Sequence, residues 1–373
     1  MNKEPVDISR FLPIGEMLRG LMEQPFIQKA DLKTILRSRG VFTCNTEKSD
    51  SIPVLMATIL SPSEFDVLRE SQNSREDNPK RITQVVAWDS DETLLDSLPD
   101  DIDFKKIVDM EFSSCKVDGA PEFVPVDGNP DHLRLEFDVE RTNLTKSWAS
   151  TKSTFPGSLE LKRIKDKGEV KVVVTHTANE TKQVASKATS SLVNTFKESG
   201  HISKAKDIER ITFGRFSNAS RIEYFLELSV ETTSNILSFE EIVDLELSPD
   251  QEAELPANMD WMSNRIDDLK LNGKSLHETF FVNEKSSHEY IFLYRVDVRY
   301  SFDISGLEGS CVVSISFPEY IKSKSDKSEL EISIKSMSFA DRLRGITKNE
   351  VKEMLLDELE TQKIEKYRNY IVD

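Results

Sequence analysis

The sequence lacks most features of a secreted, membrane-inserted or disulfide-bonded protein. Its 373 residues include three cysteines, Cys44, Cys115 and Cys311, which lie far apart and form no CxxC pair. This usage is typical of free thiols in a reducing compartment and argues against a disulfide framework or a cysteine zinc site. No stretch approaches the ~20 apolar residues of a membrane span, and the N-terminus has no basic segment followed by an apolar run. We therefore expect a folded, cytoplasmic protein that does not enter a membrane.

Catalytic and cofactor-binding motifs are also missing. The five histidines are scattered, and no HxH, HExxH, GxGxxG or P-loop pattern occurs. His176, at the end of the apolar run VKVVVTH, is expected to be a turn residue and not a general base. We therefore predict no cofactor and no metal ion, and an enzymatic role only as an alternative.

Basic residues are outnumbered and unevenly distributed. The chain has 49 Lys and Arg against 66 Asp and Glu, and its net charge of −17 argues against non-specific coating of nucleic acid. Two segments reverse the balance: 29–48 has five basic and two acidic residues, and 152–210 has twelve and seven. Any contact with a polyanion is expected in these segments.

The spacing of apolar residues predicts an α+β protein in four parts. These are an N-terminal helical domain (1–78), two β-rich α+β units (79–205 and 206–342) and a C-terminal amphipathic helix (343–373). The apolar stripe of that helix is formed by Val351, Met354, Leu355, Leu359 and Ile364. We expect this stripe to pack on a protein partner.

Local patterns predict particular elements in the two units. Thr177 and Glu180 form a capping-box pattern at the start of a helix that ends at Gly200. The later segment RIEYFLELSVET, residues 221–232, is predicted to be a strand. Ahead of it, FGRFSNAS mixes arginine with aromatic residues, which suits either a β-turn at Ser217-Asn218 with aromatic residues in the core or stacking on single-stranded nucleic acid. We favour the turn.

Two segments of similar sequence suggest an internal duplication. FKKIVDMEFS, residues 104–113, is matched by FEEIVDLELS, residues 239–248, and each is preceded by Arg-Ile-Thr. The apolar positions of the two segments agree, whereas Lys105-Lys106 is replaced by Glu240-Glu241. The shared features are those a strand needs for packing. We interpret the pair as duplicated architecture and not as a functional site.

The N-terminal domain contains a short pattern with a known counterpart. Leu32-Lys33, Leu36 and Arg39-Gly40 are followed, after a loop, by Lys48, Ile52 and Leu55. Residues 29–60 thereby resemble the SAP motif, a helix–extended loop–helix module. The resemblance implies sequence-tolerant contact with DNA. The basic residues available for it are Lys29, Lys33, Arg37, Arg39 and Lys48. Docking on another protein is the alternative for this domain.

A second pattern suggests phosphodiester chemistry. Glu160-x-Lys162 is followed on the next predicted strand by Glu169-x-Lys171 and then directly by a helix. This arrangement is similar to the core of the PD-(D/E)xK nucleases, in which carboxylates on adjacent strands hold Mg²⁺ and a lysine orients water. The resemblance implies Glu160, Glu169 and Lys171 as catalytic candidates. The alternative is a hairpin with exposed Glu–Lys pairs.

These observations favour a non-catalytic recognition or adaptor subunit of an intracellular assembly, with DNA contact through the N-terminal domain. A Mg²⁺-dependent nuclease and a purely protein-binding scaffold are the alternatives. The oligomeric state is left open.

Overall fold

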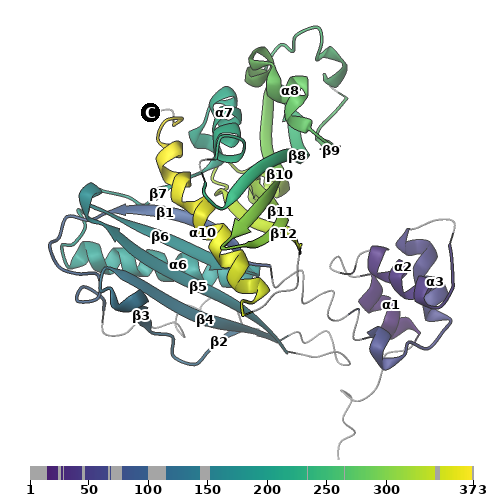
Figure 1. The fold of residues 1–373 in the computed structure, drawn as a ribbon, viewed down its shortest axis with the longest axis horizontal. Helices are drawn as coiled ribbons and strands as arrows, with labels where there is room; N and C mark the ends of the chain where they lie inside the picture. The colour runs from purple at the N-terminus through teal and green to yellow at the C-terminus, as the bar shows by residue number, and fades with distance from the viewer. Residues whose placement is uncertain are drawn as a thin grey trace, which may run out of the picture.

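The computed structural model describes residues 15–23, 27, 29–43, 47–65, 68, 78–99, 115–142, 152–232, 234–263, 265–340 and 345–371. N-terminal helices are followed by a large antiparallel sheet and a C-terminal helix (Figure 1), which confirms the predicted α+β class. The first duplicated segment, 104–113, lies outside the described residues, as does Cys44. The duplication and the domain boundaries therefore stay predictions.

The N-terminal domain has its own apolar core. It contains α1 (Glu16–Met22), α2 (Lys29–Ser38) and α3 (Lys48–Met56), where helical spacing predicts helices. At the start of the next helical turn, the backbone N–H of Glu64 donates to Ser61 Oγ at 3.3 Å, and Ser61 N–H donates to the Glu64 carboxylate at 2.7 Å. The core is formed by Leu18, Met22, Ile27, Leu32, Ile35, Leu36, Ile52, Leu55, Leu60 and Leu68.

The sheet has twelve strands within the described ranges, and every pairing is antiparallel. Its order is β2-β4-β5-β6-β1-β12-β11-β10-β8-β9, with β3 paired to β4 and β7 to β1. The strands are β1 (Lys80–Ala87), β2 (Cys115–Asp118), β3 (Phe123–Pro125), β4 (His132–Thr142), β5 (Lys152–Ile164), β6 (Glu169–His176), β7 (Glu209–Arg210), β8 (Leu237–Pro249), β9 (Leu269–Asn272), β10 (Ile291–Ile304), β11 (Leu307–Ser316) and β12 (Glu331–Phe339).

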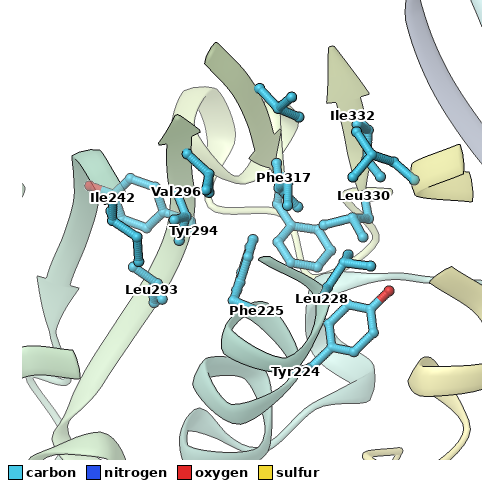
Figure 2. Close-up of a cluster of buried hydrophobic side chains, with 14 of the residues drawn as sticks. Tyr224, Phe225, Leu228, Ile242, Leu293, Tyr294, Val296, Phe317, Leu330 and Ile332 are labelled. Carbon is cyan, nitrogen blue, oxygen red and sulfur yellow. The ribbon is translucent and has the colours of Figure 1, made fainter. Parts of the chain in front are cut away.

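Helices cover both faces of this sheet. One side of α6 (Asn179–Glu198) packs on a core shared with β1 and β4–β6. On the other part of the sheet, α7 (Asn218–Ser229) and α10 (Lys348–Tyr367) pack on β8–β12, with short helices α8 (Phe280–Asn283) and α9 (Pro318–Ser323) at its margins. Figure 2 shows Phe225 of α7 beside Phe317, with ring centroids 5.8 Å apart.

The predicted strand at 221–232 is wrong, because most of this segment belongs to α7. Ser217 is the N-cap of the helix, and its hydroxyl accepts a hydrogen bond from the backbone N–H of Ser220 at 3.1 Å. Ile222, Phe225 and Leu228 recur at helical spacing and are buried. Aromatic and β-branched residues therefore suggested a strand where tertiary packing selects a helix.

The predicted start of α6 is displaced by one residue. The N-cap is Ala178, whose backbone N–H donates to the hydroxyl of Thr181 at 3.0 Å. Thr177 instead donates its hydroxyl hydrogen to the carbonyl of Pro156 at 2.9 Å. The expected end is confirmed, since Gly200 has a φ of +84° just beyond the helix.

The C-terminal helix forms as predicted, but its apolar stripe faces the chain itself. Val351, Leu355, Leu359 and Ile364 are buried in the core that α7 shares with the sheet. The expectation that this stripe is available to a partner is therefore wrong, because covering the sheet already removes it from water. Met354, which is 41% exposed, is the stripe residue on the outer side.

Candidate functional site

The basic residues of α2 lie along one side of the helix, flanking its buried side chains. Lys29, Lys33 and Arg37 follow one another at intervals of four residues, whereas the buried residues are Leu32, Ile35 and Leu36. Lys29 forms an ion pair with Glu47 at 2.9 Å. Within the described residues, Lys33 and Arg37 have no ion-pair partner, and Arg37 is exposed. We call Lys29, Lys33 and Arg37 the basic face of α2.

Arg39 has a structural role in the same domain. Its guanidinium donates to both carboxylate oxygens of Glu64, at 2.6 and 2.5 Å, and to the carbonyl of Ile59 at 2.9 Å. These bidentate hydrogen bonds lower the pKa of Glu64 to about 2 and raise that of Arg39. The contact joins the end of α2 to the segment after α3, so Arg39 is already committed to an intramolecular partner.

The structure also exposes an aromatic residue just beyond the C-terminal end of α2, which sequence reasoning missed. Phe42 follows α2 by four residues and is 80% exposed. Lys48, the remaining basic candidate, is the first residue of α3. The only local signal for Phe42 was its position between a helix-ending Gly40 and the loop of the resembled motif.

The three nuclease candidates are separately paired. Glu160 on β5 accepts a hydrogen bond from Arg134 at 2.8 Å and contacts His132 Nε2 at 2.7 Å. Burial alone would raise the pKa of Glu160, but the hydrogen bonds from Arg134 and His132 lower it below its usual value. This carboxylate thus neutralises Arg134 on β4.

Lys171 and Glu169 on β6 are held by α10. Lys171 Nζ donates to the backbone carbonyl of Glu360 at 3.0 Å, and burial lowers the pKa of this lysine against the opposing effect of the Glu360 carboxylate. Glu169 accepts two hydrogen bonds from Arg368, at 2.9 and 3.2 Å. Glu160 and Lys171 lie on the same face of adjacent strands, but the described bonds of each lead to other residues.

We expect Glu160→Gln and Lys171→Met to leave the rate of plasmid cutting in Mg²⁺ the same as that of the unmodified chain. The reason is that both residues are used in contacts that stabilise the sheet and α10. Cutting should be measured at a temperature at which all three proteins are folded, as judged by circular dichroism. If both changes abolished an activity that the unmodified chain has, these residues would form a catalytic site after all.

The aromatic segment before α7 belongs to the core. Phe213, Phe216 and Phe225 are buried, as expected, although Ser217 caps a helix in place of the predicted turn. The guanidinium of Arg221 is also buried and lies 3.5 Å from the ring centroid of Phe213. His176 is the last residue of β6 and is buried, so it is not an exposed turn residue.

The described part of the chain contains neither a metal-binding cluster nor a membrane-spanning helix. No group of three or more His, Cys, Asp or Glu side chains is placed to hold a metal ion. None of the helices there combines the length and apolarity that crossing a membrane requires.

Comparisons with known proteins concern mainly the helical domain. No curated protein matches the chain. A solved structure, the di-domain ARO/CYC StfQ from the steffimycin biosynthetic pathway, aligns with 78% of this chain and 97% of its own at 10% identity, but the TM-score of 0.17 gives no basis for argument. A family model described as the GAPS4b protein N-terminal domain matches residues 16–78, which include α1, α2 and α3. The helical domain is thus similar to the N-terminal domain of GAPS4b proteins.

Proposed function

We propose that this chain is a non-catalytic recognition subunit of a cytoplasmic multi-protein assembly and that it contacts DNA through the basic face of α2. The observation that carries the proposal is the arrangement of Lys33 and Arg37. They lie one helical turn apart on the side of α2 that flanks its buried residues, Lys33 half-buried and Arg37 exposed, and no ion pair within the described residues neutralises them. Such a pair can contact successive phosphates of a backbone.

Because the whole chain is strongly acidic, any contact with DNA is restricted to a basic segment. At a net charge of −17, most of the surface repels a polyanion, so binding depends on the segment where basic residues predominate. Repulsion elsewhere also keeps the affinity of an isolated contact low. A recognition subunit that works beside other proteins fits this distribution better than a protein that holds DNA alone.

The contacts of the other candidate residues support a non-catalytic role. Glu160, Glu169 and Lys171 each have a partner that stabilises the fold. A protein partner would have to use a surface other than the buried stripe of α10. The match of residues 16–78 to a domain model supports treating the helical region as a separate domain.

We expect the double change Lys33→Glu and Arg37→Glu to weaken DNA binding by the full chain at least about tenfold at low salt, because two attractive charges become repulsive. Binding of a labelled DNA should be measured by fluorescence anisotropy between about 50 and 200 mM salt. The plot of log affinity against log salt should lose about two units of slope.

A matched variant controls for the change in net charge. Lys274 and Lys327 are exposed and lie outside the helical domain, so Lys274→Glu with Lys327→Glu alters the total charge equally. This control should bind DNA with an affinity close to that of the unmodified chain. Absence of binding by the unmodified chain at low salt, or an equal loss in both variants, would contradict the proposal.

A further inference from the structure

Phe42 is an exposed aromatic side chain four residues beyond the last residue of α2. It is 80% exposed, the largest value among the bulky apolar side chains of the described residues. A single exposed apolar residue is common on protein surfaces and needs no explanation by itself. The position of Phe42 is what distinguishes it, because the backbone just before it is hydrogen-bonded to α2 and the last turn of that helix carries the exposed Arg37.

The end of α2 determines where Phe42 lies. Gly40 has a φ of +72°, and its N–H donates to the carbonyl of Arg37 at 2.9 Å. The N–H of Val41 donates to the carbonyl of Leu36, also at 2.9 Å, and the Val41 side chain packs on the domain core. Phe42 is the next residue along the chain, and its side chain is exposed.

Arg39 restrains the same segment from the other side. Its guanidinium joins Glu64 and the carbonyl of Ile59, which fixes the residue three positions before Phe42. An exposed ring on a restrained backbone loses little conformational freedom when a ligand covers it. Phe42 and Arg37 are both exposed and only five residues apart along this restrained segment.

We propose that Phe42 is a stacking platform for an unpaired nucleic-acid base, so that the basic face of α2 prefers single-stranded DNA to duplex DNA. The inference rests on the proposed DNA contact and specifies its substrate. Base stacking on an aromatic side chain, combined with a basic surface that follows the phosphates, is how single strands are bound without sequence preference. Bases within a duplex already stack on one another, so their faces are not available to Phe42.

The test compares three substitutions at one position in the full chain. Phe42→Leu keeps an apolar side chain but removes the ring, Phe42→Trp enlarges the ring, and Phe42→Ala removes both. Anisotropy titrations use a single-stranded oligodeoxythymidylate and a blunt duplex of equal length. We expect Leu and Ala to weaken single-strand binding about tenfold, Trp to match or exceed the unmodified chain, and duplex binding to stay unchanged. Equal melting temperatures establish that all variants are folded.

The outcomes separate this inference from the function on which it rests. If Phe42→Leu binds single strands as well as the unmodified chain does, or if both DNA forms lose affinity equally, stacking is ruled out while DNA contact is retained. If the unmodified chain binds neither probe at low salt, the proposed DNA contact itself fails. Loss of single-strand binding in Phe42→Leu with recovery in Phe42→Trp supports the inference.

Discussion

Replacing Glu360 by alanine should lower the free energy of unfolding by about 3–5 kcal/mol, because the change leaves buried positive charge without its partner. The side chain of Lys363 is fully buried, and its Nζ lies 3.1 Å from Glu360 Oε1. The hydroxyl of Thr83 donates to the other carboxylate oxygen, Oε2. Both Lys363 and Thr83 are buried, so solvent does not compensate for the lost carboxylate.

The pKa of Glu360 reflects the same contacts. Burial would raise it, but the charges of Lys363 and Lys171 and the hydrogen bond from Thr83 lower it. The ionised carboxylate is thus the form that the folded chain stabilises. Glu360→Ala removes the negative member of a cluster between β1, β6 and α10, and the remaining cations must be desolvated alone.

Urea denaturation followed by circular dichroism measures this effect. Glu365→Ala is the matched control on the same helix, since Glu365 forms an exposed ion pair with Lys167 and should contribute no more than about 1 kcal/mol. The double variant Glu360→Leu with Lys363→Met should recover much of the loss, because it removes both charges. Equal urea midpoints for Glu360→Ala and Glu365→Ala would show that the buried Glu360–Lys363 pair contributes no more to the free energy of unfolding than the exposed pair does.

The sequence predicted helices and strands more accurately than it predicted which side chains contact one another. Alternation along β6 places Val170, Val172 and Val174 in a buried core, and this pattern is local, so it can be recognised without a structure. The partner of Lys171 is 189 residues away on α10. No spacing rule reports such a contact, so an E-x-K pattern on a strand could be interpreted as a metal site when its lysine stabilises a helix.

The basic face of α2 shows the same limit, because sequence spacing does not report long-range contacts. Helical spacing identified the basic residues of α2, because side chains four apart share a face. It could not separate Arg37, which is exposed, from Arg39, which Glu64 and Ile59 bind. That difference depends on how the segment after α3 folds back on α2. For the same reason Phe42 was missed, since its exposure depends on the direction of the chain after Gly40.

The two predicted β-rich units meet along a short seam. Within the described residues β1 pairs with β12 at Lys80 with Ser333 and at Arg81 with Ile332, and with the two-residue strand β7 at Gln84 with Arg210 and at Val85 with Glu209. Buried charged side chains lie on both faces of this seam. On one face Arg81 pairs with Glu353 and Asp357 of α10, and on the other Lys182 of α6 pairs with Glu331 of β12 at 2.8 Å. Ionic contacts therefore supplement a brief strand pairing.

The face of the seam formed by α6 should make stability depend on pH. Burial would raise the pKa of Glu331, but its contacts with His176 and Lys182 lower it to about 2, from 4.5. Because the carboxyl has a lower pKa in the folded state, it contributes stability above about pH 4.5, and this contribution is lost as the pH falls toward 2. A difference of this size corresponds to about 3 kcal/mol.

Glu331→Gln should therefore be less stable than the unmodified chain by about 3 kcal/mol at neutral pH, and the difference should shrink as the pH falls from about 4.5 to 2. Urea midpoints across this range measure it. Glu319→Gln is the control, because Glu319 contacts the same Lys182 at 2.5 Å but is 46% exposed, so water replaces much of the lost interaction. A stability difference that is the same at pH 3 and at pH 7 would mean that Glu331 acts through packing, whereas convergence of the two curves in acid would establish that its charge holds the two halves of the sheet together.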